Sequence, residues 1–301
     1  MRFYLALIAL PVALVAATPV GKRCTGTISS LNDVANAQKC TTININAFTV
    51  PAGKTLAIEC ISGTTVNMLG DVTFGVANWG GPLFSISGTN IKFNGNGHTF
   101  DGQGPSYWDG KGGNGGVLVQ SDGFDVSTND LIIEDSTIYN QDDCIAINKG
   151  SNIIFQRNTC SGGHGISIGS VSTGATVKNV QILNNKIVNN DQALRIKTKA
   201  DATNAAVTNV VFTGNTATGV NKYGVIVDQG YPTTLGKPGN NVVMSGITFG
   251  TNNIAVGANA QRVAVNCGSK CTGTWDWSGL KVTGGKAGKM YNYKNIKAGS
   301  Y

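Results

Sequence analysis

The sequence predicts an all-β fold: a single-stranded right-handed parallel β-helix with a short N-terminal capping helix. Glycine accounts for 41 of the 301 residues, hydrophobic residues for 41% and charged residues for only 13%. This composition is typical of a turn-rich β protein and not of a disordered chain. Short apolar runs follow one another between Gly, Asn, Asp and Ser, and no amphipathic helix separates them. The third observation is a sequence repeat.

Five segments of the chain align so that the third and fifth residues of each are apolar. A unit of this size cannot bury its apolar side alone and must stack on its neighbours, so each repeat is expected to form one coil. Strands of neighbouring coils would then lie about 4.8 Å apart. A β-propeller is the alternative, but it needs repeats of about 40 residues or more. The segments begin at Asp122, Asp143, His164, Gln192 and Tyr223, with offsets of 21, 21, 28 and 31 residues.

The first residues are expected to be removed from the mature protein. Arg2 precedes an apolar run over 3–15, and small residues end it at Ala17, which predicts a signal peptide at 1–17. A membrane anchor is the alternative, but the run is shorter than the about 18 residues that a span needs and contains Pro11. The dibasic pair Lys22-Arg23 predicts a short propeptide at 18–23. We therefore expect a secreted, extracellular protein with a single domain at 24–301.

The mature chain begins with a segment that we expect to cap the solenoid. Residues 30–38 place Leu31, Val34 and Ala37 at helical spacing, which predicts a short helix. A cap is needed because the open end of a stack exposes apolar side chains and unpaired strand edges. A strand at 42–50 and a turn at 51–54 follow, and further strands are predicted at 55–59, 71–74, 83–86, 91–93, 131–133, 153–155, 180–183, 210–212 and 242–249.

Seven cysteines bear on the compartment and on the covalent framework. In an oxidising environment, cysteines that are near neighbours in sequence are natural partners. The sequence therefore predicts the disulfides Cys24–Cys40, Cys144–Cys160 and Cys267–Cys271, and leaves Cys60 free. The spacing of the cysteines is not that of a zinc site, so we expect no metal ligation by them.

The net charge narrows the classes of partner. The formal charge is +7, and because Arg2, Lys22 and Arg23 contribute three of these charges, the mature chain carries +4. Basic proteins bind nucleic acids, anionic membranes or acidic substrates. Secretion disfavours nucleic acid, and no second apolar run is long enough to span a membrane. We therefore expect no nucleic-acid partner and no membrane partner.

The repeat gathers polar side chains on one wall of the predicted solenoid. The first residues of the aligned segments form a column on its outside, Asp142 lies beside Asp143, and Arg195 and Lys197 face the same way. A single Asp at a turn commonly bonds backbone amides for structural reasons. Several carboxylates in one column, with an imidazole beside them, instead suit glycoside cleavage, in which one carboxyl group donates a proton and another takes one from water. The two cations suit a substrate that carries carboxylates.

At these residues the chain resembles the polygalacturonases of glycoside hydrolase family 28, secreted pectin-hydrolysing enzymes with a right-handed β-helix fold. The resemblance covers nearly all of the mature chain and is greatest to the fungal endopolygalacturonases. It would make residues 24–301 a single catalytic domain. The matching motifs are NQDDC (Asn140–Cys144), GGHGISIGS (Gly162–Ser170), RIK (Arg195–Lys197), YGV (Tyr223–Val225) and DGQG (Asp101–Gly104).

The resemblance implies a function and a role for each site residue. The function is hydrolysis of α-1,4-galacturonosidic bonds in polygalacturonate or pectin, within the chain and with inversion of configuration, as part of plant cell-wall pectin degradation. It implies no metal and no cofactor, and we expect a monomer. Asp142 would be the general acid, and Asp122 and Asp143 would hold and deprotonate the attacking water. His164 would tune the acid, Arg195 and Lys197 would bind galacturonate carboxylates, and Tyr223 would line an adjacent subsite.

The sequence departs from the family pattern in three places. Gln120-Ser121-Asp122 stands where the family has Asn-Thr-Asp, the C-terminal tail lacks the last cysteine pair, and about two coils are missing near 116–117. Two other functions are therefore weighed against the hydrolase. The hydrolase stays the leading hypothesis, and an inactive pectin-binding homologue is an alternative because of the missing coils. A calcium-dependent pectate lyase would use the Asp cluster to hold Ca²⁺.

Overall fold

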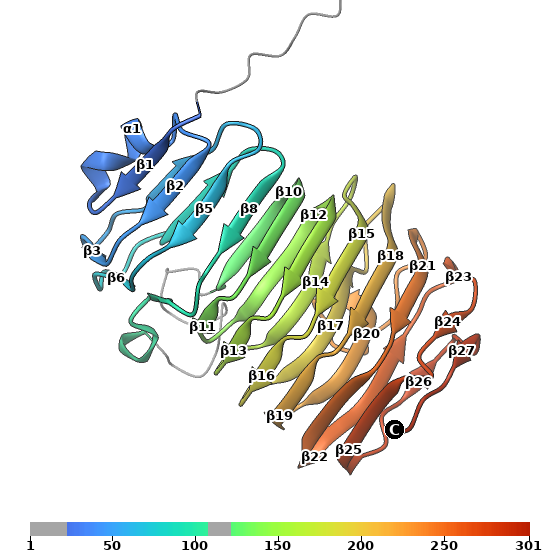
Figure 1. Cartoon of the computed structure of the whole chain (residues 1–301). Coiled ribbons are helices and arrows are strands. Elements are labelled where there is room, and N and C mark those ends of the chain that lie inside the picture. The colour runs from blue at the N-terminus through green and yellow to red at the C-terminus, as the bar shows by residue number, and fades with distance from the viewer. Residues whose placement is uncertain (1–22, 108–121) are drawn as a thin grey trace, which may run out of the picture.

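The computed structural model describes residues 23–107 and 122–301. Parallel strands stack into one elongated solenoid that runs from the N-terminal helix to the C-terminal strands (Figure 1). The predicted parallel β-helix is confirmed. The expected signal peptide at 1–17 lies outside the described residues, as does the expected propeptide except for Arg23.

The N-terminal end of the stack is capped as the sequence predicts. The 3₁₀-helix η1 (Leu31–Asp33) runs into the single turn of α1 (Val34–Ala37), which packs on β1 (Thr25–Ile28). Gly26 permits this packing, because a Cβ at its position would lie 2.4 Å from the Cα of Ala37. The Cys24–Cys40 disulfide ties the strand to the end of the helix. The cap therefore closes the apolar interior at the first coil.

Each coil contributes strands to three rows that run along the solenoid axis. The first row has no interruption from the cap to the C-terminal coils. Its strands pair in this order: β1, β2 (Thr42–Ile45), β5 (Thr65–Met68), β8 (Ile91–Asn94), the second half of β10 (Phe124–Glu134), the second half of β12 (Asp143–Gln156), β15 (Thr176–Leu183), β18 (Ala205–Thr213), β21 (Val242–Phe249) and β23 (Cys271–Thr272).

The second row is made of shorter strands, and it is also continuous. It is separated from the first row by a tight bend in each coil. Its strands are β3 (Phe48–Val50), β6 (Val72–Phe74), β9 (Thr99–Asp101), β11 (Thr137–Tyr139), β13 (Thr159–Ser161), β16 (Lys186–Val188), β19 (Thr216–Val220), the first part of β22 (Asn252–Asn266) and β25 (Leu280–Lys286).

The third row is interrupted once. β4 (Leu56–Glu59) and β7 (Phe84–Ser87) pair only with each other among the described residues. The row then resumes with the first half of β10 and continues through β12, β14 (Gly165–Val171), β17 (Gln192–Lys199), β20 (Tyr223–Tyr231), the second part of β22 and β26 (Met290–Tyr291). A last pair, β24 (Trp275–Asp276) with β27 (Ile296–Lys297), closes the C-terminal end. The interruption falls in the coil that contains the predicted shortening.

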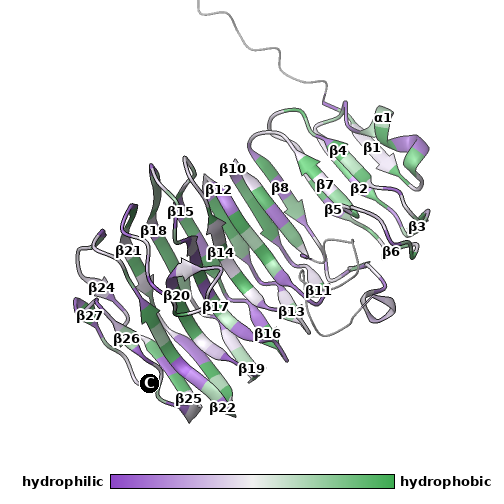
Figure 2. Ribbon diagram, turned by 180° about the vertical axis from the view of Figure 1, so that it is seen from behind, coloured by the Kyte–Doolittle hydropathy of each residue, from purple (hydrophilic) through white to green (hydrophobic). Residues whose placement is uncertain are grey.

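The core fills the interior of the coils with the residues that the repeat predicts. Phe124 and Val126 are 6% and 5% exposed, and the corresponding apolar pairs of the next four segments are fully buried. Burial of each such aliphatic side chain contributes about 1.5–3 kcal/mol. Hydrophobic colour accordingly runs along the strands of each row in Figure 2. The fully buried pairs are Ile145/Ile147, Ile166/Ile168, Leu194/Ile196 and Val225/Val227.

A ladder of buried asparagines holds the bend between the first and second rows. Asn158, Asn185, Asn215 and Asn252 occupy the same place in successive coils and are at most 1% exposed. The side-chain oxygen of each of the last three accepts the backbone N–H of the asparagine one coil earlier, at 2.9–3.1 Å. Each side-chain amide also donates to a backbone carbonyl of the preceding coil. The ladder thus satisfies backbone groups that the bend removes from the strand pairing.

The structure forms the disulfides Cys24–Cys40, Cys144–Cys160 and Cys267–Cys271 and leaves Cys60 as a thiol. Burial raises the pKa of the Cys60 thiol to about 11, which disfavours its reactive thiolate form. No helix in the described part of the chain is long and apolar enough to cross a membrane.

We predict that Asn185→Ala lowers the free energy of unfolding by about 2–5 kcal/mol. The substitution leaves the N–H of Asn158 and the carbonyl of Phe155 buried without their partners, and each such loss costs about 1–3 kcal/mol. Urea unfolding followed by circular dichroism measures the difference. Asn253→Ala, at an exposed position beside the ladder, should change stability by less than about 0.5 kcal/mol. Equal effects of the two substitutions would refute a structural role for the ladder.

Candidate active site

The third row brings the predicted site residues together. Strands β12, β14, β17 and β20 lie side by side (Figure 1). The residues sit at or near the start of these strands or on their outward face. Asp122 comes just before β10, Asp142 just before β12 and His164 just before β14, whereas Asp143 begins β12 and Tyr223 begins β20. Arg195 and Lys197 lie on β17.

The alignment of Asp143 with His164 is wrong by one residue. β12 and β14 pair Asp143 with Gly165 and then Ile145 with Ile166, so a bulge at Cys144 absorbs one residue. The bulge leaves the apolar residues in register and moves the residues before it along the strand. As a result His164 lies opposite Asp142, and its Nδ1 is 2.9 Å from Asp142 Oδ1.

Two carboxylates share one backbone donor at the centre of the site. The N–H of Asp143 donates to Asp142 Oδ1 at 2.9 Å and to Asp122 Oδ1 at 3.1 Å. The side-chain amide of Asn140 donates to the carbonyls of Asp142 and Asp143, at 2.9 and 2.8 Å. Asn140 therefore fixes the peptide units that carry the acidic pair, and the shared N–H holds Asp122 against them from the preceding coil.

Asp143 belongs to the polar column on the outside of the strands, but neighbouring side chains of that column bury it. Its side chain is 1% exposed, and both oxygens form ion pairs, with Arg195 Nη2 and Lys197 Nζ, each at 2.6 Å. The hydroxyl of Ser167 donates to it at 2.7 Å and accepts from Arg195 Nε at 3.0 Å. A buried carboxylate requires this pairing because desolvation of an isolated charge costs several kcal/mol. The two cations thus face a protein carboxylate in this structure.

Asp122 and Asp125 occupy the more apolar side of the site. Burial, together with the charges of Asp142 and Asp143, raises the pKa of Asp122 to about 8, although Lys197 acts in the opposite direction. Burial also raises the pKa of Asp125, against the lowering effect of a hydrogen bond from Asn148. These shifts follow from the cost of placing further negative charge in a poorly solvated cluster.

Sequence reasoning did not identify two residues that contact the site, Asp191 and Ser167. Asp191 Oδ2 lies 3.6 Å from His164 Nε2 and 2.7 Å from Lys222 Nζ, so His164 has a carboxylate at each ring nitrogen. Asp191 precedes Gln192 as Asp142 precedes Asp143, and this parallel was the available signal. Ser167 faces outward in register with Arg195. Ser167 lies between the inward-facing Ile166 and Ile168, so the alternation of the strand could have predicted that it faces outward with the site residues.

Tyr223 lies one coil beyond the charged cluster. It pairs in register with Gln192 on one side and Gln261 on the other. Gln261 Nε2 donates to the phenol oxygen at 3.4 Å. The ring is half-buried and thus forms part of the wall that continues from His164 towards the C-terminal coils.

The described residues do not fit a calcium site. Asp142, Asp143 and His164 bring ligand-type atoms within 4.8 Å of one another. Calcium requires about 6–8 oxygen ligands, whereas here one of the three groups is an imidazole. Both oxygens of Asp143 are already bound by cationic side chains, which would repel a further cation.

We predict that Asp122→Asn flattens the dependence of stability on pH. Because the pKa of Asp122 is raised to about 8 in the folded state from the ordinary 3.8, the folded protein keeps a proton that the unfolded chain releases. The stabilisation is complete below about pH 4 and is lost as the pH rises through about 8. The urea midpoint of the unmodified protein should therefore fall across this range, and that of the variant should fall less. Parallel pH curves would contradict the shift.

Lys197→Met is predicted to lower the free energy of unfolding by about 3–5 kcal/mol, because removal of one partner leaves charge buried on Asp143 without full compensation. Lys297→Met removes a lysine from the exposed pair with Asp276, at 3.4 Å, and should cost at most about 1 kcal/mol. Thermal and urea unfolding of both variants makes the comparison. A small effect at Lys197 would mean that Arg195 and Ser167 alone stabilise the Asp143 carboxylate.

Comparison with known proteins places the chain in a family. Residues 40–120 and 118–300 match the family described as glycosyl hydrolases family 28, and the two matched segments meet where the sequence predicts a shortening. "Endopolygalacturonase B" of Aspergillus oryzae is 38% identical over 350 residues, covering 96% of this chain and 95% of the relative. "Endopolygalacturonase 1" of Colletotrichum lindemuthianum is 37% identical, with 100% and 99% covered.

A solved structure agrees with these relatives. Endopolygalacturonase I from Stereum purpureum, determined as a complex with two galacturonate molecules, superposes with a TM-score of 0.75 at 40% identity. The match covers 91% of this chain and 99% of that one. With a β-helix, an acidic cluster beside a histidine, and relatives of this identity over nearly the whole chain, the protein belongs to glycosyl hydrolases family 28.

Proposed function

We propose that the protein is a secreted endopolygalacturonase that hydrolyses α-1,4-galacturonosidic bonds within polygalacturonate and pectin. The observation that carries the proposal is the cluster of Asp122, Asp142 and Asp143 around one backbone N–H, with His164 at Asp142 and two cations at Asp143. The relatives described above bear the name of this activity. The three disulfides are typical of an oxidising, extracellular environment.

Asp142 is the general acid in this proposal. Its side chain is 19% exposed, against 1% for Asp143, so it is the member of the adjacent pair that a glycosidic oxygen can reach. His164 contacts the same oxygen that accepts the Asp143 N–H. The imidazole and the backbone donor therefore fix the direction of the carboxyl group that gives up its proton.

Asp122 and Asp143 hold the attacking water, and Asp122 takes its proton. The charge of Asp142 is one of the causes of the raised pKa of Asp122. A proton on Asp142 removes that charge and favours the ionised form of Asp122. The two groups thus share a proton so that one is an acid when the other is a base, as coupled carboxyl groups do.

The ion pairs of Asp143 favour inversion of configuration over retention. The ligand atoms of Asp142 and Asp143 lie within 4.8 Å, closer than the separation of about 6.5–9.5 Å that is usual in inverting enzymes. A retaining mechanism, however, needs a carboxylate oxygen that is free to attack the sugar. Both oxygens of Asp143 are held in ion pairs in a buried position. Attack by water activated at Asp122 is the route that these contacts favour.

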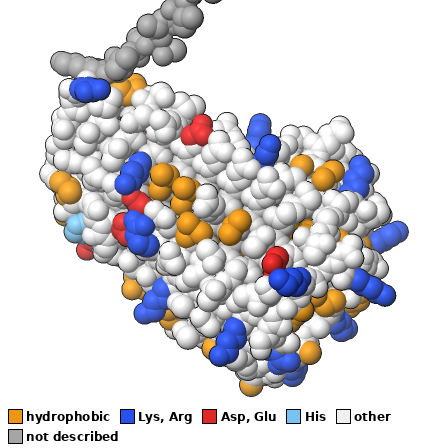
Figure 3. All heavy atoms as spheres, turned by 45° about the vertical axis from the view of Figure 1, so that its right-hand side comes forward, with side chains coloured by type: hydrophobic (Ala, Val, Ile, Leu, Met, Phe, Trp, Pro, Cys, Tyr) orange, Lys and Arg blue, Asp and Glu red, His pale blue; other side chains and the backbone are white. Residues whose placement is uncertain are grey.

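Substrate binding uses charge and a ring surface. Arg195 and Lys197, which also pair with Asp143, bind galacturonate carboxylates in this proposal, and Tyr223 lines the next subsite on the following coil. Basic side chains are spread over the face drawn in Figure 3, where acidic ones are few, and residues 24–301 carry a formal charge of +4. Such a field attracts an anionic polymer before it reaches the site.

We predict that Asp142→Asn lowers the rate of reducing-end release from de-esterified polygalacturonate by about 10²–10⁴-fold, the contribution typical of a positioned general acid. Asp276→Asn, at an exposed position in the C-terminal coil, should keep full activity. Chain lengths of the early products, separated by anion-exchange chromatography, distinguish internal cleavage from removal of terminal units. The anomer formed first, observed by proton NMR, reports inversion.

Each alternative function has its own outcome in this experiment. Unsaturated products that disappear with a chelator would identify a calcium-dependent lyase. Binding of polygalacturonate without release of reducing ends by the unmodified protein would identify a non-catalytic pectin-binding protein. Equal rates for the unmodified protein and Asp142→Asn would remove Asp142 from the role of acid.

A further inference from the structure

We propose that an aromatic-walled pocket beside Asp122 receives the methyl ester of an esterified galacturonate residue. The protein would then act on partly methyl-esterified pectin, with a neutral residue on one side of the cleaved bond and an acidic residue on the other. This inference rests on the proposed function and names the substrate class of the same site.

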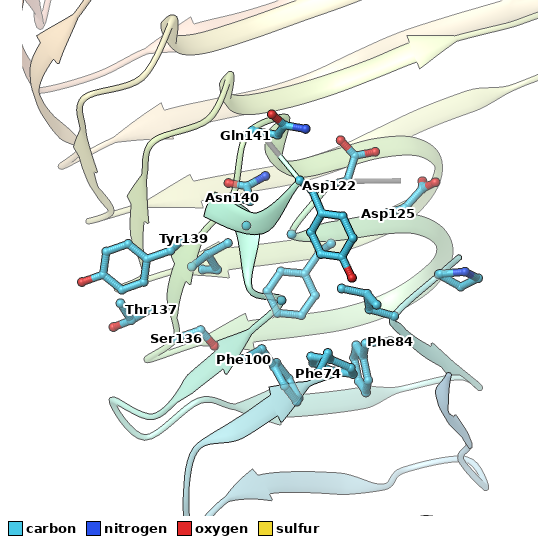
Figure 4. Close-up of a pocket in the computed structure, with 18 of the residues that line it drawn as sticks. Phe74, Phe84, Phe100, Asp122, Asp125, Ser136, Thr137, Tyr139, Asn140 and Gln141 are labelled. Atoms are coloured by element: carbon cyan, nitrogen blue, oxygen red, sulfur yellow. The ribbon is translucent and has the colours of Figure 1, made fainter. Parts of the chain in front are cut away.

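The pocket lies where the third row is interrupted, between the N-terminal coils and the coil of β10. Phe74, Phe84 and Phe100 lie at one end of it, and Asp122, Asn140 and Gln141 at the other (Figure 4). Its lining also includes Leu83, Tyr107 and Phe124. Because Asp122 belongs both to the pocket wall and to the carboxylate cluster, a sugar bound next to the reacting bond reaches the pocket.

The walls of the pocket are built from ordered contacts. The rings of Phe84 and Phe100 stack with centroids 4.8 Å apart, and Phe93 links both to Phe124 at distances of about 6 Å. The N–H of Ala77 donates to the phenol oxygen of Tyr107 at 2.8 Å. These contacts fix the apolar surfaces in place without a ligand.

The size of the pocket suits a small apolar group. Its volume is about 110 Å³, whereas an engineered apolar cavity of about 150 Å³ holds benzene. A pyranose ring with its hydroxyls is larger than benzene and does not fit inside. A carbomethoxy group is smaller than benzene, and it fits while the ring stays outside, next to Asp122.

Charge excludes the free acid from this pocket. The acidic residues in its described lining are Asp122 and Asp125, and the lining also includes His98 but no Lys or Arg. A galacturonate carboxylate placed there would lose its hydration beside Asp125 and would find no cationic partner in the described lining, which is unfavourable. Methylation removes that charge and leaves an apolar methyl group.

The side of the cluster opposite the pocket is cationic. Arg195 and Lys197 lie on β17, two strands beyond β12 in the third row, and they suit a free carboxylate. The site therefore has an apolar, acidic side towards the N-terminal coils and a cationic side towards the C-terminal coils. A substrate that alternates ester and acid across the cleaved bond matches both sides at once.

The experiment compares kcat/KM on fully de-esterified polygalacturonate with kcat/KM on randomly half-esterified pectin. The unmodified protein should cleave the esterified substrate at least as well. Leu83→Lys places a cation in the pocket and should lower the ratio of esterified to de-esterified activity by about 10-fold or more, within the range for loss of one apolar contact in a pocket. Leu83→Ala, which introduces no charge, should lower it by a smaller factor.

Val243→Lys introduces the same cation at an exposed position on β21 and should leave the ratio unchanged. Mass spectrometry of the products should find the ester enriched at one of the two newly formed chain ends. A wild-type protein active only on the de-esterified polymer, an unchanged ratio in both Leu83 variants, or esters equally frequent at both ends would overturn the inference. Absence of reducing-end release from both substrates would instead contradict the proposed hydrolase function.

Discussion

The parallel hydrogen-bonded ladder between coils is the constraint on which the site depends. The position of the polar residues of each coil relative to the coil before it is set mainly by this pairing. The groups that meet at Asp143 are remote in sequence, with Arg195 and Lys197 52 and 54 residues away. A shift of one residue in any pairing would move a side chain to the other face of its strand. The buried apolar pairs hold the register against such a shift.

Asp143 shows how this constraint becomes chemistry. A carboxylate with 1% exposure requires the two cations that pair with it. The three charged groups together form an ion-paired cluster next to Asp122 and Asp142. The other two carboxyl groups differ in their solvation: Asp142 is the more exposed, and Asp122 is poorly solvated. Two carboxyl groups in different environments can divide the roles of acid and base. The ion pairs at Asp143 thus help Asp142 to act as the acid and Asp122 to act as the base in the proposed reaction.

The sequence predicted those features that depend on the periodic pattern. The apolar residues at Ile145, Ile147 and their equivalents recur because the interior of every coil must be filled, and the solenoid follows from them. The bulge at Cys144 was missed because it preserves this apolar register and displaces only the residues before it. The burial of Asp143 was missed because outward direction on a strand does not tell whether neighbouring side chains cover the residue.

Contacts made across coils by single residues were also beyond prediction. Asp191 approaches His164 from the next coil; the repeat places Asp191 in the position of Asp142, but it does not show that the carboxylate contacts the imidazole. The shortened stretch was visible in the sequence, but its position in the third row was not. That position depends on which strand of a coil is lost, and the flanking strands β8 and β10 still pair in the first row.

The interruption between β7 and β10 also affects the stability of the solenoid, because it weakens one interface between neighbouring coils. In a stack of coils, stability is approximately a sum of interfaces between neighbours. Among the described residues, the interface between the coils of β8 and β10 has two rows of strand pairing, whereas the interfaces between the coils of β12, β14, β17 and β20 have three. Ion pairs from Glu134 to Lys92 and Arg157, at 2.8 and 2.7 Å, reinforce the first row there. The coils from β10 onward therefore form the larger cooperative block, and a pulling force along the axis would separate the N-terminal coils from it first.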